Sequence, residues 1–221
     1  MNLQVMVDPQ VKAALPGAAY GIITCMLENA PRDEGLWAEL QETAAHIRSV
    51  YTLDTVRTQP NIAATREAYK ALGGDPNRYR PSADALYRRV VKGNELYQIS
   101  SLVDFVNLVS LRTGFSIGGF DRELISGNVE VGVGRPNEPY EGVGRGEINI
   151  AGIPVLRDAM GAFGTPTSDH VRTALRPETS SFYMHIYGYS SREELEKAMY
   201  YAVSLLNRYF TSAEISTDIL Q

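Results

Sequence analysis

The chain has little of the chemistry that depends on cysteine, histidine or a metal. Among its 221 residues there are one cysteine, Cys25, and three histidines, His46, His170 and His185. A single cysteine excludes an internal disulfide, and the apolar neighbours of Cys25 indicate a buried, unreactive thiol rather than a nucleophile. Because none of these residues has the spacing of zinc ligands, we expect neither a metal centre nor a cofactor.

The chain also lacks a long hydrophobic run and an excess of positive charge. Its longest apolar stretch, residues 18–27, is too short and too interrupted to cross a bilayer, and no basic segment precedes an apolar one at the N-terminus. We therefore expect a cytoplasmic protein with no membrane partner. The net charge of −5 argues against a surface that binds nucleic acid as a whole. We expect no DNA partner, and any contact with RNA must be local.

The length and composition of the chain indicate one domain spanning residues 1–221. Hydrophobic residues make up 44% of the chain and charged residues 21%, both ordinary for a globular protein. In the first half the patterns predict two strands, at residues 4–7 and within 18–27, and three helices, one beginning at Pro9, one from Asp33 to Tyr51 and one from Ser82 to Gly93.

The second half is richer in glycine and in strand patterns. We expect strands at residues 115–120, 129–133 and 147–150, and a short final strand at 213–219. Ser191 and Glu194 form a capping box that opens a helix. The glycines of residues 142–146 predict a loop or hairpin, because no Gly-Lys-Ser/Thr follows as in a phosphate-binding loop. Helices segregated from glycine-rich strands indicate an α+β fold.

The segment 181–189 alternates between two kinds of side chain. Phe182, Met184 and Ile186 fall on one face of a strand, and Tyr183, His185, Tyr187 and Tyr189 fall on the other. The aromatic, polar face can cover either a second structural layer or a ligand pocket, and the first alternative is favoured.

The segment 102–121 is the most informative part of the sequence. Its first half, residues 102–111, is apolar almost all round, as in a helix enclosed by protein. The exceptions, Asp104 and Asn107, lie on one face of this helix, and buried polar groups of this kind need hydrogen-bond partners. We expect them to support a pocket.

This segment resembles the signature of the B3/B4 domain of the β subunit of bacterial phenylalanyl-tRNA synthetase. In that family a Val-Asp-x-x-Asn helix and Leu-x-x-Gly lead into His-Ala-Phe-Asp. Without a gap, the matching residues here are Val103, Asp104, Asn107, Leu111, Gly114, Phe120 and Asp121. Residues 153–161 and 176–179 extend the likeness more loosely, so that it is best supported over residues 65–190 and closest to free-standing B3/B4 proteins.

The resemblance implies a layered B3/B4 fold with mixed β-sheets packed against helices. In the synthetase this domain hydrolyses tyrosine that is wrongly esterified to tRNA, which needs a positioned water and oxyanion donors but no covalent nucleophile. Here Gly118 replaces the family histidine, and the glutamate that reads the tyrosine hydroxyl falls at His185, in a register that crosses an insertion near residues 163–169. The resemblance therefore does not extend to the residues that select tyrosine, and it assigns no catalytic residue.

Ten residues are our candidates for the pocket. Asp104 and Asn107 would brace it, and Gly118 and Gly119 would open space in it or let a ligand approach the backbone. Polar groups further along the chain complete the set, which is Asp104, Asn107, Gly118, Gly119, Asp121, Arg157, Asp158, Thr165, Thr167 and His185. The hydroxyls near Pro166 have an equally good explanation in turn chemistry.

One basic cluster accompanies the helix that begins at Ser82. It comprises Arg78, Arg80, Arg88, Arg89 and Lys92, against only Asp84. A solvated helix face explains it, and a phosphate-contacting edge is the alternative. The sequence thus leaves three hypotheses open. The chain binds an amino-acid-like ligand, with tRNA or aminoacyl-tRNA as partner, and hydrolyses the ester in trans; it binds RNA or an amino acid without catalysis; or its ligand is an unrelated metabolite.

Overall fold

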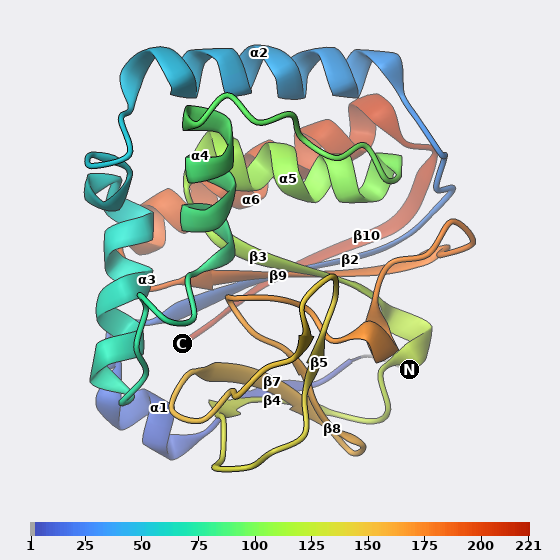
Figure 1. Cartoon of the computed structure of the whole chain (residues 1–221). Helices are drawn as coiled ribbons and strands as arrows, with labels where there is room; N and C mark the ends of the chain where they lie inside the picture. Colours follow the sequence, from blue (N-terminus) through green and yellow to red (C-terminus); the bar gives the residue numbers. More distant parts are fainter. Residues whose placement is uncertain (1–2) are drawn as a thin grey trace.

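The computed structural model describes residues 3–221, which form three layers (Figure 1). The middle layer is a fully antiparallel sheet whose strand order is β10 (Ser212–Leu220), β2 (Ala19–Leu27), β9 (Ser181–Gly188) and β3 (Ser116–Asp121). The second sheet is mixed, with the order β1 (Val5–Val7), β4 (Val129–Val133), β7 (Pro154–Asp158) and β8 (Gly161–Gly164). A two-stranded hairpin joins β5 (Glu141–Gly142) to β6 (Gly146–Glu147).

Helices cover the face of the middle sheet that points away from the second sheet (Figure 1). The six helices of the described chain are α1 (Pro9–Ala14), α2 (Glu34–Val50), α3 (Pro60–Ala71), α4 (Ser82–Val91), α5 (Ser101–Thr113) and α6 (Arg192–Tyr209). Three-residue 3₁₀ turns lie at Val56–Thr58, Arg122–Leu124 and Val171–Thr173. In Figure 1, α2, α4, α5 and α6 lie above the middle sheet and the second sheet lies below it. The α+β class that the sequence predicted is confirmed.

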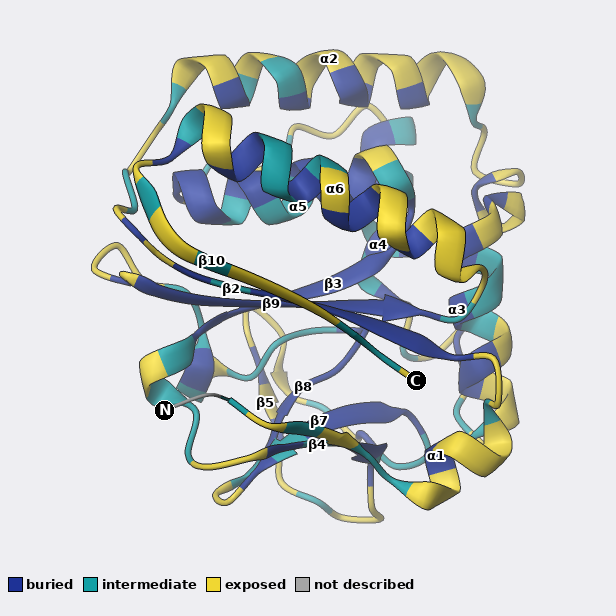
Figure 2. Cartoon of the chain, turned by 180° about the vertical axis from the view of Figure 1, so that it is seen from behind, coloured by how far each residue is buried: buried dark blue, intermediate teal, exposed yellow. Residues whose placement is uncertain are grey.

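The middle sheet is buried on both faces. Phe182, Met184 and Ile186 of β9 belong to the apolar core under the helices, whereas Tyr183 and Tyr187 belong to the core between the two sheets. Every residue of β9 is buried, and the strand is dark throughout in Figure 2. The alternation in residues 181–189 therefore separates two structural layers, as the sequence favoured.

The helix that carries the signature motif lies inside the helical layer. In α5, Leu102, Phe105, Leu108 and Val109 are fully buried, and the helix contacts α2, α4, α6 and β3. Ser100 caps its N-terminus, since its Oγ accepts the N–H of Val103 at 3.4 Å. An enclosed position explains why this helix is apolar almost all round.

Three expectations need correction. The sequence reasoning placed no element between residues 52 and 72, where α3 lies. It predicted a strand at 147–150, but only Gly146–Glu147 are extended, and Ile150 is instead buried against other apolar side chains such as Tyr69. The final strand is nine residues long rather than short, with a register shift between Ala213 and Ser216. None of the described helices combines the length and hydropathy that a bilayer span requires.

Gly114 is the sharpest backbone requirement in the signature segment. It ends α5 with a φ of 76°, and a Cβ at this position would lie on the side chain of Gln59. That side chain caps α3 through the N–H of Ile62 and donates to the carbonyl of Thr113. A left-handed glycine therefore joins the end of one helix to the start of another.

We expect Gly114→Ala to lower the free energy of unfolding by about 2–4 kcal/mol, because it combines left-handed strain with displacement of the Gln59 cap. Gly73→Ala is the matched control, since Gly73 has a φ of 92° but open space around its Cα. It should cost about 1 kcal/mol. Urea denaturation of the two variants measures the difference, and equal losses would contradict the role of Gln59.

Candidate functional site

A groove lies beside the free edge of β3. It has a volume of about 290 Å³. Its walls come from α5, from β3 and from the segment 165–175, with residues of the loop before α5 and of the β5–β6 hairpin at the rim. The lining residues are Ser82, Ile99, Val103, Val106, Asn107, Ile117, Gly119, Val143, Thr165, Thr167, Ser168, Asp169, Ala174 and Leu175. A mostly apolar hollow with a few convergent polar groups is the usual form of a small-molecule site.

Hydrogen bonds fix the wall that faces α5. The hydroxyl of Thr165 accepts the N–H groups of Thr167 and Ser168, and Thr167 is bonded to the hydroxyl of the buried Tyr69 at 2.8 Å. The hairpin is attached to the same wall, because the N–H of Val143 donates to the carbonyl of Asp169 at 2.9 Å. Turn chemistry therefore accounts for the hydroxyl of Thr165, whereas the hydroxyl of Thr167 joins this wall to Tyr69 and to the carbonyl of Tyr79. Both residues line the groove.

Asp169 is the chemically distinctive residue of the groove. Its Oδ2 accepts the N–H of Gly119 at 3.2 Å, on the outer edge of β3. Burial of the carboxyl group raises its pKa to about 8, and the hydrogen bond from Gly119 offsets only part of that rise. A carboxyl group in a groove that exchanges its proton near neutral pH is suited to general acid and base chemistry.

The two neighbouring glycines of β3 play different parts. A Cβ at Gly119 would lie 2.9 Å from the side chain of Val106, on the groove side of the strand, so a side chain here would intrude on the groove. At Gly118 a Cβ would lie 2.4 Å from the ring of Phe120 and 3.0 Å from Oδ1 of Asp169. The expectation that Gly118 opens space is therefore wrong, because an aromatic ring and a carboxylate already occupy it.

Asn107 and Asp104 of α5 have separate surroundings. Asn107 is half-buried, lines the groove and has no hydrogen-bond partner among residues 3–221. Asp104 is fully buried one turn earlier, does not line the groove, and neither of its carboxylate oxygens has a hydrogen-bond partner. Burial raises the pKa of Asp104 to about 6, and the nearby Gln98 amide and Arg32 charge offset only part of the rise.

Asp104 should destabilise the fold at neutral pH. Its pKa in the folded state is about 6 against an ordinary value of 3.8, so the folded protein binds the extra proton between these values. The free energy of unfolding then falls as the pH rises from 3.8 through 6. We expect Asp104→Asn to raise it by about 1–3 kcal/mol at pH 7.5 and by little at pH 4. Denaturant titrations at both pH values measure this, and a loss of stability at pH 7.5 would contradict it.

Three further candidates, Arg157, Asp158 and Asp121, lie outside the groove and are hydrogen-bonded to other residues of the chain. Arg157 binds Glu138 through two hydrogen bonds of 3.0 and 2.8 Å and Glu130 through one of 3.0 Å. Asp158 accepts two bonds of 3.0 Å from Arg172. Asp121 is buried at the end of β3, and its Oδ2 accepts the hydroxyl of Thr179 at 2.9 Å. In this structure their hydrogen bonds hold strands and turns together.

His185 is sealed between the two sheets. It is fully buried, its Nδ1 is bonded to the hydroxyl of Tyr183 at 2.8 Å, and its Nε2 has no partner. The rings of Tyr20 and Tyr187 lie 5.5 and 4.7 Å from the imidazole, and their hydroxyls are also without partners. Burial lowers the pKa of His185 to about 3, so the imidazole is neutral at physiological pH.

The acid stability of the protein should reflect this histidine. Its pKa is about 3 in the folded state against an ordinary value of 6.5, so only the unfolded chain takes up the proton between these values. The free energy of unfolding therefore falls as the pH drops from 6.5 towards 3, by an amount on the order of 5 kcal/mol. A titration of the His185 ring followed by NMR gives the folded-state value. A midpoint near 6 would contradict the burial argument.

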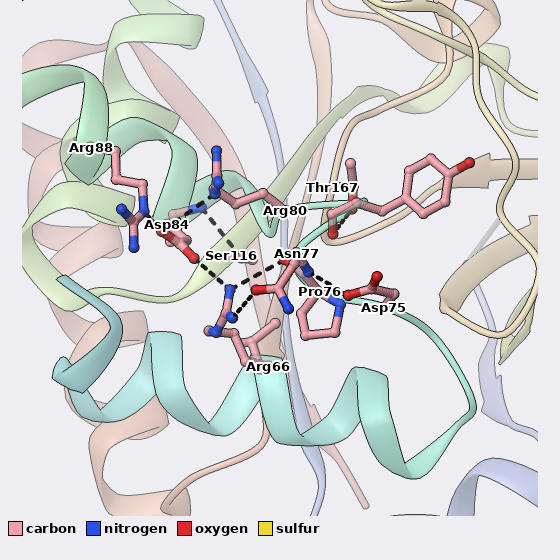
Figure 3. A network of polar contacts seen from close by, with 12 residues as sticks. Arg66, Asp75, Pro76, Asn77, Arg80, Asp84, Arg88, Ser116 and Thr167 are labelled. Atoms are coloured by element: carbon pink, nitrogen blue, oxygen red, sulfur yellow. Dashed lines mark hydrogen bonds and ion pairs between the residues drawn. The ribbon is translucent and has the colours of Figure 1, made fainter. Parts of the chain in front are cut away.

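The basic cluster surrounds a buried carboxylate (Figure 3). Asp84 of α4 is fully buried and accepts from Arg88 at 2.6 Å and from Arg66 of α3 at 2.9 Å, with Arg80 at 3.8 Å. Arg66 also donates to the side chain of Asn77 at 2.6 Å. Part of the positive charge that the sequence displays is therefore neutralised by a carboxylate inside the fold, and the arginines tie α3, α4 and the loop between them together.

The other members of the basic cluster, Arg78, Arg89 and Lys92, are not among the ion-pair partners of Asp84. Arg78 lies over the ring of Tyr79 at 5.2 Å and Lys92 is exposed. Arg89 donates through Nε to the carbonyl of Glu95, and its guanidinium lies 3.9 Å from the ring centroid of Tyr97.

The structure thus brings four of the ten pocket candidates to one groove, namely Asn107, Gly119, Thr165 and Thr167. Asp169 is not among the ten candidates that the sequence provides. Its position next to β3 depends on a contact 50 residues away in the chain. The apolar lining from Val103, Val106 and Leu175 was also missed, since in the sequence these residues look like ordinary core positions.

Comparisons with known proteins identify the class to which this fold and groove belong. The model of the B3/4 domain family matches residues 64–211. The chain therefore belongs to the B3/4 domain family. Among solved structures, a match is the N-terminal fragment of the phenylalanyl-tRNA synthetase β-subunit from Pyrococcus horikoshii, at 14% identity and a TM-score of 0.48. It covers 99% of this chain, which spans only half of that fragment. A comparison with curated proteins gives no match.

Proposed function

We propose that this chain binds the aminoacyl group of an aminoacyl-tRNA in the groove beside β3 and hydrolyses the ester in trans. The observation that carries the proposal is the groove itself. It has a volume of about 290 Å³ and is lined by the carboxyl group of Asp169, whose pKa is about 8. The family supports it, because B3/B4 domains of the synthetase hydrolyse misacylated tRNA. The ligand is expected to be an amino acid ester, with tRNA as the partner.

Asp169 would act as the general base and then as the general acid. Its carboxylate takes a proton from a water molecule while the water oxygen attacks the ester carbonyl carbon. The free amide of Asn107 donates to the developing oxyanion. When the tetrahedral intermediate collapses, the bond to the ribose oxygen breaks, and Asp169 returns the proton to that oxygen. The products are the free amino acid and the tRNA hydroxyl.

Asp169→Asn tests this assignment, because the amide keeps the acceptor for the Gly119 N–H but cannot take up a proton. We expect hydrolysis of the preferred misacylated tRNA to fall by about 10²–10⁴-fold with little change in KM. In the unsubstituted protein, kcat/KM should rise with pH and level off above about 8, because the base form of Asp169 predominates there. Asp54→Asn, at an exposed turn residue, is the matched control.

A second candidate function is binding without hydrolysis. The observations that favour it are the glycine at the position of the family histidine and the sealed environment of His185. A panel of misacylated tRNAs, assayed for deacylation and for binding, separates the two. Binding without turnover of any substrate would leave only the binding module. Phosphate contacts weaken as the salt concentration rises, so tRNA retention that is indifferent to salt would favour the remaining hypothesis, a metabolite unrelated to tRNA.

A further inference from the structure

The groove beside β3 continues into a second cavity of about 280 Å³. The two share the walls formed by Ser82, Val106, Asn107 and Ile117. The second cavity is additionally lined by Ala85, Leu86, Arg89, Ser110 and Arg145. A ligand whose reacting part lies beside Asp169 can therefore extend past Asn107 without leaving the protein surface.

This second cavity has a different chemical character from the first. Its two charged lining residues are both arginines, Arg89 of α4 and Arg145 in the turn of the β5–β6 hairpin. Arg145 is exposed and has no ion-pair partner among the described residues. Arg89 uses only its Nε in a bond to a backbone carbonyl, which leaves its two terminal nitrogens for a ligand. Planar guanidinium groups of this kind match phosphate oxygens.

An aromatic platform lies next to Arg89. Tyr97 is 68% exposed, and the guanidinium of Arg89 covers one face of its ring at 3.9 Å. Because the ring is mostly exposed, a planar group can stack on it, and base stacking on exposed aromatic rings is a general feature of single-stranded nucleic acid binding. The hairpin also carries Glu141 and Glu147, which pair across its two strands, but neither lines the cavity.

We propose that this second cavity binds the terminal nucleotide of the RNA to which the amino acid is esterified. Arg145 and Arg89 contact its phosphate, and the base stacks on Tyr97. The inference rests on the proposed function, since it assumes an aminoacyl group beside Asp169. It deepens that function by assigning the RNA contact to Arg145 of the hairpin and to Arg89 of the basic cluster. Arg80 and Arg88 of that cluster are instead paired with Asp84.

The test compares an RNA minihelix ending in CCA with a panel of amino-acid amides, which mimic the aminoacyl group without RNA. We expect Arg145→Ala and Tyr97→Ala each to weaken minihelix binding about fivefold or more at low salt, with amide binding unchanged. For Arg145→Ala the slope of log Kd against log salt should fall by about one. Lys12→Ala removes an exposed cation from α1 and is the matched control.

The outcomes separate the two proposals. If Arg145→Ala and Tyr97→Ala bind the minihelix as tightly as the unsubstituted protein, or if Lys12→Ala weakens it equally, the terminal-nucleotide site is wrong and the amino-acid groove stands. If the unsubstituted protein binds amides but not the minihelix, the same conclusion follows. If it binds neither, the proposed function falls as well. Both substitutions are at exposed positions, so circular dichroism should confirm an intact fold.

Discussion

The burial of the middle sheet on both faces is the constraint on which the rest of the structure depends. Helices cover one face and the second sheet covers the other, so the fully buried strand β9 has no side chain that can meet a ligand without disrupting a core. Chemistry is then possible only at the sheet edges. At the β3 edge the segment 165–175 stands away from α5, and the space between them is the groove that contains Asp169.

The shape of that groove depends on contacts behind it. Asp84 holds α4 to α3 through its ion pair with Arg66 and pairs with Arg88 within its own helix (Figure 3). Tyr69 of α3 holds Thr167 in the groove wall. A buried carboxylate with two short ion pairs is costly to disturb, since loss of one partner leaves an uncompensated charge. Part of the basic cluster thus has a structural role, and this role places the polar side of the groove at a fixed distance from Asn107.

Much of the fold could be predicted from the sequence, because strong local patterns report strong burial. For this reason the sequence predicts both the alternation in β9 and the enclosed helix α5. The helix α3 was not found, since its buried positions are spread among polar residues. The site was only partly predictable. Asn107 and Gly119 lie within a continuous motif, whereas Asp169 reaches the groove through a contact with a strand edge that is distant in the sequence, and burial there raises its pKa. Arg157 was predicted to line the pocket, but it binds Glu138 and Glu130, which lie far from it in the sequence.

The opposite edge of the same sheet has its own consequence. Strand β10 is long and exposed, as its light colour in Figure 2 shows, and such strands readily recruit a strand from another molecule. Here Glu214 adopts a φ of 55° within the register shift, and Asp218 adds a second acidic side chain further along. A kinked, negatively charged border offers a poor template for intermolecular pairing, which protects the protein against aggregation at this exposed edge of the sheet.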